Sequence, residues 1–164
     1  YATTFINNEA TGVRASFNLF FNGLNNAVDV GKVSKIGKPA GLETSPTPNP
    51  EIAQAPFSGI SLELLMASME MVEEAFFTEN STNIADYLFF ILNDNSLSAD
   101  IQTKIDEVQE AINAINLCLE VAIINEPTQV ENLHTKLTEL GVLLTVDARS
   151  ALSVIITATD NDGD

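Results

Sequence analysis

Apolar residues recur at helical spacing through the last two thirds of the chain. From Ser58 onward one set of them is spaced by three or four residues, the period of a helix with one buried face. This set is Leu62, Leu65, Met69, Val72 and Phe76. The hydroxyl of Ser61 suits the N-cap of such a helix. A shorter set, at Ile84, Leu88 and Ile91, predicts a second helix over about 83–93 that ends at the Asn93-Asp94-Asn95 sequence.

The most regular pattern in the chain alternates spacings of four and three residues. Its positions are Ile101, Ile105, Val108, Ile112, Ile115, Leu119 and Ala122. A heptad seam of this kind is typical of helices that lie lengthwise against partner helices. It predicts one long third helix that ends before Pro127. It also places Cys118 in an apolar run, as a small buried side chain.

A fourth helix is predicted to begin at Thr128, which forms a capping-box match with Glu131. Its apolar positions are Val130, Leu133, Leu137, Leu140 and Leu144. Beyond Gly141 two interpretations compete, because the apolar residues continue at helical spacing but many of them are β-branched. We favour the helix. The predicted fold is therefore mainly α, an antiparallel bundle of about four helices within residues 57–158.

The N-terminal segment shows a different pattern. Val13, Ala15, Phe17 and Leu19 alternate with polar residues, which is the period of a half-buried strand, and the Asn22-Gly23 pair is typical of a hairpin turn. A helix is the alternative, because Phe17, Phe20, Phe21 and Leu24 also have helical spacing. Several glycines weaken that alternative. Residues 1–36 are therefore predicted to form an extended arm that could contain a β-hairpin.

Prolines separate this arm from the helices. Five of the chain's six prolines lie within residues 37–56, where they oppose helix and central strand and favour an extended connection. The predicted domain organisation is an arm over 1–36, a Pro-rich linker over 37–56 and an acidic helical bundle with an acidic tail over 57–164.

Charge reinforces this division. The net charge of −16 comes entirely from residues 57–164, because acidic and basic side chains cancel over residues 1–56. Such a surface repels nucleic acid and anionic lipid, so neither is an expected partner. Charged residues make up only 18% of the chain, which begins at Tyr1. This composition and the absence of an initiating Met lead us to expect an extracellular or cell-surface protein. We expect no transmembrane segment, because no apolar run approaches the length of a bilayer-spanning helix.

The residues that usually carry catalysis are scarce. His134 is the only histidine and Cys118 the only cysteine, so a histidine-based metal site or a nucleophile–histidine pair would have to recruit His134. The glutamate clusters near residues 70–74 and 106–110 lack the Glu-x-x-His pairs of a di-metal bundle. The sequence therefore predicts a protein that is not an enzyme.

The C-terminal tail contains a candidate calcium site, and one loop contains a candidate glycosylation site. Asp160, Asp162 and Asp164 alternate as in the first positions of an EF-hand loop, so the tail is a candidate calcium site, with a solvated acidic tail as the alternative. No other cofactor is expected. Asn80-Ser-Thr82 is a glycosylation sequon between the first two predicted helices.

The preferred functional prediction is a secreted structural subunit that assembles with copies of itself into an appendage, filament or layer. The arm would supply subunit contacts by strand addition or groove binding. Its candidate contact residues are Phe17, Leu19, Phe21, Lys32, Lys35 and Lys38. The alternative is a small helical module that binds an apolar ligand, or an adhesion domain. The residues that could line a ligand site are Met66, Met69, Phe76, Phe77, Phe89 and Phe90.

Overall fold

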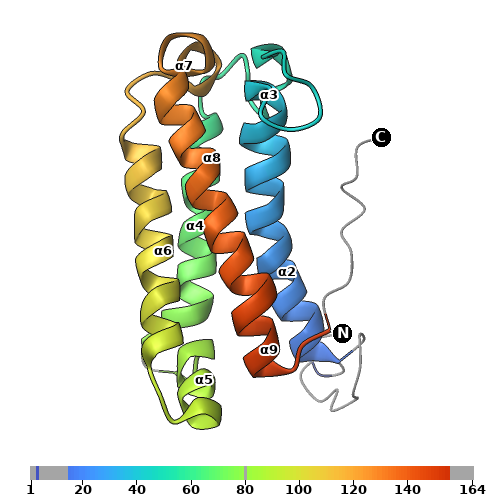
Figure 1. Cartoon of the computed structure of the whole chain (residues 1–164), viewed down its shortest axis with the longest axis vertical. Helices are drawn as coiled ribbons and strands as arrows, with labels where there is room; N and C mark the ends of the chain where they lie inside the picture. Colours follow the sequence, from blue (N-terminus) through green and yellow to red (C-terminus); the bar gives the residue numbers. More distant parts are fainter. Residues whose placement is uncertain (1–2, 4–14, 80, 156–164) are drawn as a thin grey trace.

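Four long helical rods run side by side along the computed structural model (Figure 1), which describes residues 3, 15–79 and 81–155. The first rod comprises α2 (Ser16–Val30), η1 (Gly31–Gly37) and α3 (Lys38–Ala40). The second and third are α4 (Ser61–Phe77) and α6 (Ser96–Asn113). The fourth comprises α8 (Pro127–Val142), η3 (Leu143–Ala148) and α9 (Arg149–Leu152). The prediction of a mainly helical fold is confirmed.

The rods alternate in direction, as in an up-down-up-down bundle. Each packs against two others in the ring α2, α4, α6, α8. At the lower end of Figure 1, α5 (Ile84–Leu92) connects α4 to α6. At the upper end, α7 (Leu119–Asn125) connects α6 to α8. The apolar stripes predicted for α4, α6 and α8 line the core, and every predicted position of the α8 stripe is buried, whereas Ile91 of the predicted α5 stripe is exposed.

The prediction of an extended arm is wrong over residues 16–36, which are helical and form one side of the bundle. Phe21, Leu24 and Val28 face the core, whereas Leu19 is exposed, so the alternation that suggested a strand does not mark a buried face. Tertiary packing overrides the low helical propensity of glycine here. A Cβ at Gly31 would lie 3.0 Å from Leu65 Cδ1, so this glycine lets the first rod lie close to α4.

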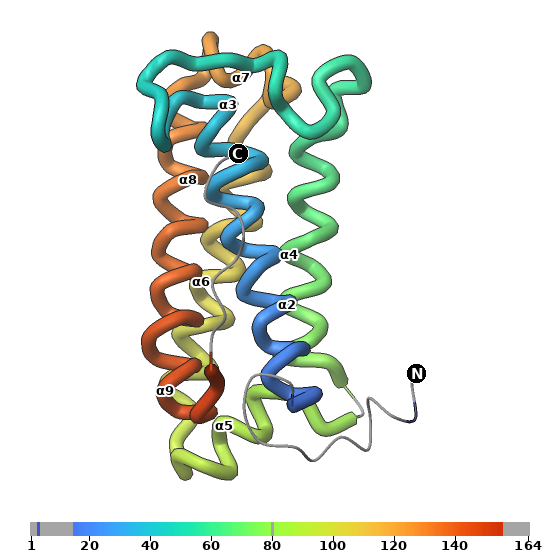
Figure 2. Tube along the Cα trace, turned by 90° about the vertical axis from the view of Figure 1, so that its right-hand side faces the viewer, coloured from blue at the N-terminus to red at the C-terminus, as the bar shows by residue number. Residues whose placement is uncertain are grey.

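The connector, residues 41–60, crosses the upper end of the bundle (Figure 2). It contains the short helix η2 (Pro50–Ile52). The helix before it runs four residues further than the linker prediction allowed, with Pro39 as the second residue of α3. Gly41 then ends the helix with φ +73°, and a Cβ there would lie 2.9 Å from Pro48 N. Only glycine suits that position.

The prediction of one continuous third helix is also wrong. Helix α6 ends at Asn113, and the backbone N–H of Asn116 donates to Glu126 Oε2 at 2.9 Å in the turn that follows. Ile115 and Leu119 nevertheless remain buried. The heptad pattern therefore identified the core positions correctly, but the chain turns across the end of the bundle instead of extending beyond it.

Two helix starts differ from their predictions, at α4 and α8. Helix α4 has Ile60 at its N-cap, and Ser61 is its first helical residue. Helix α8 has Glu126 at its N-cap and no side-chain cap bond, because Pro127 begins the helix and Thr128 already lies inside it. The preference for helix beyond Gly141 is confirmed as far as Leu152, after which Ser153 adopts φ +54°.

Candidate functional site

Helix α5 is the most apolar element of the bundle, and it is held by its own sequence. Asn83 and Asp86 form a reciprocal capping box, with Asp86 N–H donating to Asn83 Oδ1 at 2.8 Å. Asn93 ends the helix in the left-handed conformation. These caps fix a nine-residue helix at the lower end of the bundle without help from a large buried face.

Most of the large apolar side chains of α5 face solvent. Only Ile84 and Leu88 are buried, and Phe90 is 82% exposed. The exposed set, named here the α5 surface, is Tyr87, Phe89, Phe90, Ile91 and Leu92. Isolated exposed apolar residues are common, but five large ones within nine residues form a patch of the kind that marks an interaction site.

A hollow of about 610 Å³ adjoins one side of α5. This aromatic hollow is lined by Phe17, Phe20, Ala75, Thr78, Thr82, Asn83, Ile84 and Tyr87. Phe17 and Tyr87 meet edge to face, with ring centroids 5.6 Å apart, so the start of α2 and the middle of α5 are fixed against each other. None of the lining side chains is charged, and the volume suits a drug-sized apolar molecule.

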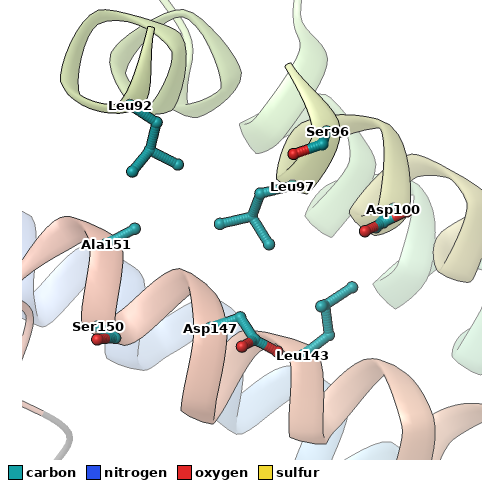
Figure 3. Close-up of a pocket in the computed structure, with 8 residues that line it drawn as sticks. All are labelled: Leu92, Ser96, Leu97, Asp100, Leu143, Asp147, Ser150 and Ala151. Carbon is teal, nitrogen blue, oxygen red and sulfur yellow. The ribbon is translucent and has the colours of Figure 1, made fainter. Parts of the chain in front are cut away.

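A second hollow, of about 540 Å³, lies on the other side of α5 (Figure 3). Leu92, Leu97 and Leu143 provide its apolar part, and Asp100 and Asp147 provide two exposed carboxylates from the neighbouring third and fourth rods. Ser96, at its edge, donates through its hydroxyl to Asp94 Oδ2, and this hydrogen bond lowers the pKa of Asp94. The arrangement is open and contains no enclosed pair of carboxylates.

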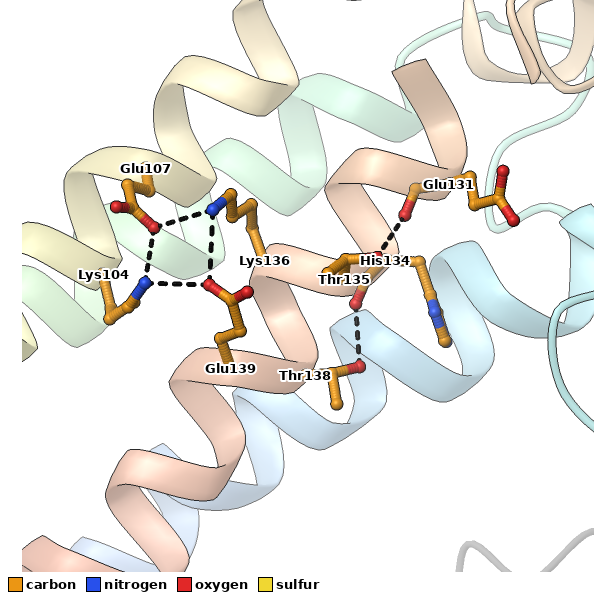
Figure 4. A network of polar contacts seen from close by, with 8 residues as sticks. All are labelled: Lys104, Glu107, Glu131, His134, Thr135, Lys136, Thr138 and Glu139. Carbon is orange, nitrogen blue, oxygen red and sulfur yellow. Dashed lines mark hydrogen bonds and ion pairs between the residues drawn. The ribbon is translucent and has the colours of Figure 1, made fainter. Parts of the chain in front are cut away.

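Ion pairs join the third and fourth rods on a different face (Figure 4). Lys104 Nζ lies 2.8 Å from both Glu107 Oε2 and Glu139 Oε2, and Lys136 Nζ lies 3.1 Å from Glu107 Oε2 and 3.3 Å from Glu139 Oε2. The hydrogen bond from Lys104 lowers the pKa of both carboxylates, and the hydrogen bond to Glu107 raises the pKa of both lysines. All four side chains are therefore charged at neutral pH and clamp α6 to α8.

His134 is paired with a carboxylate of the connector. Its Nε2 lies 2.8 Å from Glu43 Oε1, and both side chains are about four-fifths buried. The ring therefore contacts a glutamate and not a serine or cysteine. Among the described residues, no group of three or more His, Cys, Asp and Glu side chains is arranged to hold a metal ion.

A family model described as Imelysin, and labelled as a peptidase family, matches residues 1–144. The chain belongs to the imelysin family. Comparison with curated proteins and with solved structures gave no match. The peptidase label belongs to the family as a whole, and it does not by itself assign a reaction to any residue of this imelysin-family chain.

The candidate contact residues of this imelysin-family chain lie in several environments. Phe21 is buried and packs edge to face on Phe76, so it belongs to the chain's own core. Phe17 lines the aromatic hollow, and Leu19 is exposed on α2. Of the lysines, Lys32 lines a groove between α2 and α8, and Lys38 is half-buried in α3.

Lys35 has internal partners. Its Nζ donates to Ser68 Oγ at 2.9 Å and to the backbone carbonyl of Leu64 at 3.4 Å, which joins η1 to α4. Burial lowers the pKa of this amine. The predicted contact with a neighbour's acidic surface would therefore have to break hydrogen bonds that Lys35 already makes within the chain.

Cys118 is exposed, which corrects the prediction that it is buried. Cys118 occupies the N-cap position of α7, where the chain has left the predicted third helix. Gly59 of the connector lies beside it, since a Cβ at Gly59 would be 3.5 Å from the Cβ of Cys118. Beside it, the Ser61 hydroxyl donates to Glu120 Oε1 at 2.6 Å. These contacts hold the end of the connector against α7.

Other predicted sites fall outside the described residues. These are the candidate calcium ligands Asp160, Asp162 and Asp164 and the sequon residue Asn80. Among the described helices, none is both long and apolar enough to span a membrane. Of the residues suggested for an apolar ligand site, Met69 and Phe76 are fully buried core residues, whereas Phe89 and Phe90 are exposed.

Of the α5 surface, only Phe89 and Phe90 were predicted as candidate site residues, although the composition of α5 carries a signal for the whole surface. Eight of the nine residues in Ile84–Leu92 are apolar. A helix this short presents only one face to a core, so a sequence that is apolar all round leaves large side chains uncovered unless other elements enclose it. Here α5 lies at the end of the bundle, where only one of its faces is covered.

Proposed function

We propose that this chain is a non-catalytic, self-associating subunit that contacts its partners through the apolar lower end of the bundle. The observation that carries this proposal is the α5 surface, in which Phe90 is 82% exposed between other exposed apolar side chains. Covering such side chains with a partner removes apolar area from water, and each square ångström contributes roughly 25 cal/mol.

Charge favours this end of the molecule as a contact between identical chains. Two chains of net charge −16 repel each other over most of their surface. Within α5 the only charged residue is Asp86, and the adjoining aromatic hollow has no charged lining residue. Contact through this region therefore brings few like charges together, and burial of the aromatic side chains can dominate.

The non-catalytic part of the proposal rests on where the one histidine lies. The His134 side chain is about four-fifths buried under the connector, and its Nε2 faces Glu43. A general base must instead reach a nucleophile or a substrate proton. The ion pairs of Lys104, Glu107, Lys136 and Glu139 are likewise accounted for by the clamp between α6 and α8.

Hydrogen–deuterium exchange at low and high protein concentration tests the contact surface. We expect the amides of Ile84–Leu92 to exchange more slowly at high concentration, and the substitution Phe90→Ser to abolish this difference. Residues 130–140 of α8, none of which lines either hollow beside α5, serve as the internal control. Equal exchange of α5 at both concentrations would count against self-association through this end.

A second candidate function is the binding of a small apolar ligand, which the aromatic hollow favours. Its volume of about 610 Å³ lies within the usual range for ligand sites, and its aromatic lining is typical of them. An environment-sensitive apolar dye would show saturable fluorescence enhancement with the wild type and a weaker response with Phe20→Asp. Saturable binding by a chain that stays monomeric would favour the ligand carrier over the assembling subunit.

The expected location and the candidate calcium site are also part of this proposal. An extracellular or cell-surface location fits a structural subunit, and calcium at Asp160, Asp162 and Asp164 would add a bridge between copies. Measuring the assembly in calcium and then in excess chelator tests the calcium contribution, with the triple substitution of these residues by Asn as the matched variant.

A further inference from the structure

The upper end of the bundle carries a second exposed apolar patch, far from α5. Its large side chains are Ile52, Phe57, Ile60, Leu117, Val121 and Ile124. The connector and α7 bring them together, since η2 packs on α7 and Gly59 lies beside Cys118. Both ends of the bundle are therefore apolar.

Phe57 is the most exposed of these side chains, at 101% of its reference area. It is also held in place by its backbone. The Ala55 carbonyl accepts hydrogen bonds from the N–H groups of Ser58 and Gly59, both at 3.2 Å, and Pro56 restricts the residue before it. The backbone at Phe57 is therefore fixed before binding, and a fully exposed ring has no internal contacts to give up when it enters a pocket, which favours its use as an anchor.

The aromatic hollow is a suitable receptor for such a side chain. It lies at the opposite end of α4, which begins next to the Phe57 turn and whose residue Ala75 lines the hollow. The seventeen residues of α4 separate the two by about 25 Å at 1.5 Å per residue. Phe57 therefore cannot fill the hollow of its own chain.

We propose that Phe57 of one copy inserts into the aromatic hollow of a second copy, so that chains join head to tail. This inference rests on the self-association proposed above. The charge pattern supports this pairing. The run from Ile52 to Leu62 contains no charged residue, and neither does the lining of the hollow. These two surfaces can meet without the repulsion that opposes other contacts between chains of this net charge.

A contact between two different surfaces is heterologous, and it leaves one free anchor and one free hollow at the ends of every assembly. Copies then add one by one. A contact of α5 with α5 would instead pair the same surface on both chains and stop at a dimer. The two modes of association respond differently to the loss of Phe57.

Complementation between two variants tests the pairing by light scattering. Phe57→Ser removes the anchor and keeps the hollow, whereas Phe20→Asp disrupts the hollow and keeps the anchor; Thr82→Arg provides a second blocked hollow if Phe20→Asp disturbs folding. We expect each variant alone to associate about thirtyfold more weakly than the wild type, the loss typical of truncating a central aromatic anchor. An equimolar mixture of the two should form dimers, because one intact anchor then meets one intact hollow.

Two results would overturn the pairing in different ways. If Phe57→Ser associates as strongly as the wild type, the head-to-tail contact is wrong although self-association through α5 still stands. If the wild type associates but the mixture stays monomeric, Phe57 does not enter the hollow. A wild type that is monomeric at all concentrations contradicts both this pairing and the proposed function. Met71→Ser, which alters an exposed side chain of α4, is the matched control and should behave as the wild type.

Discussion

Nε2 of His134 lies 2.8 Å from Oε1 of Glu43, so the only histidine of the chain joins the fourth rod to the connector. The residues are 91 positions apart in the sequence. Glu43 is held on its other side by Gly37, where a Cβ would lie 2.5 Å from Glu43 Cγ. The contact positions the connector over the end of the bundle, and through the connector it positions the Phe57 turn.

Loss of the imidazole should release the connector before it affects the rods. We expect His134→Ala to accelerate amide exchange over residues 42–52 while α6 and α8 keep their protection, because the core residues of the rods are untouched. Native-state hydrogen exchange measures this directly. Thr135→Ala changes an exposed neighbour on the same helix and should leave the connector unaffected. Faster exchange spread evenly through α8 would mean that His134 supports the helix and not the connector.

Glycine to alanine substitutions in the first rod should have opposite effects at two positions. At Gly37 the new Cβ would meet Glu43 and the backbone oxygen of Lys32 within 2.8 Å, so Gly37→Ala should destabilise the protein by about 1–3 kcal/mol. At Gly23 nothing lies within 4 Å, so Gly23→Ala should stabilise α2 by roughly 0.5–1 kcal/mol. Urea unfolding gives both free energies. Equal effects of the two substitutions would contradict the close packing at Gly37.

The clamp between α6 and α8 should depend on pH and salt. The pKa values of Glu107 and Glu139 are lowered, so their contribution is present above the ordinary glutamate pKa of about 4.3 and is lost as pH falls through their lowered values. The pKa values of Lys104 and Lys136 are raised, so their contribution is present below the ordinary lysine pKa of about 10.4 and is lost as pH rises through the raised values.

Glu107→Gln should therefore lower the melting temperature at pH 7, and the difference from the wild type should shrink at pH 3 and in 1 M salt. Thermal unfolding followed by circular dichroism measures it. Glu110→Gln, on the same helix but outside these ion pairs, is the control. A difference that is unchanged at pH 3 would show that Glu107 stabilises the bundle by packing and not by charge.

Lys35 should behave as an internal residue and not as a subunit contact. Because burial lowers its pKa, the folded state binds its proton less tightly than the unfolded state does, and stability should rise as pH rises from the lowered value towards 10.4. We expect Lys35→Met to raise the melting temperature at pH 7 and to leave self-association unchanged. If Lys35→Met weakens self-association and Lys136→Met does not, Lys35 contacts a neighbouring subunit and the present interpretation is wrong.

The parts of the fold that the sequence predicts well are those in which one periodic face meets one core. The stripes of α4, α6 and α8 belong to this class, and their apolar positions are buried as predicted, except that Leu62 is only partly buried. The first rod was harder to predict because its glycines lower helical propensity locally, and the benefit of Gly31 appears only when Leu65 lies against it. Long-range packing of this kind leaves no mark on the local pattern.

The turn at residues 114–118 and the exposure of Cys118 have a similar explanation. The heptad spacing continues through Ile115 and Leu119, but where a helix ends depends on the length of its neighbours and on partners such as Glu126, which accepts from Asn116 N–H. For the candidate site, the composition of α5 predicts an exposed apolar face. The sequence alone does not place Phe17, Phe20 and Tyr87 around one hollow, because they come from two separate helices.

Mass measured by light scattering across a wide range of protein concentrations tests the central claim, self-association through the lower end of the bundle, most directly. The account predicts that the wild type exceeds 17.7 kDa and grows with concentration, that Phe90→Ser falls towards the monomer mass, and that Val146→Ser, which alters an exposed side chain elsewhere, matches the wild type. A wild type that stays at 17.7 kDa at every concentration would contradict the account.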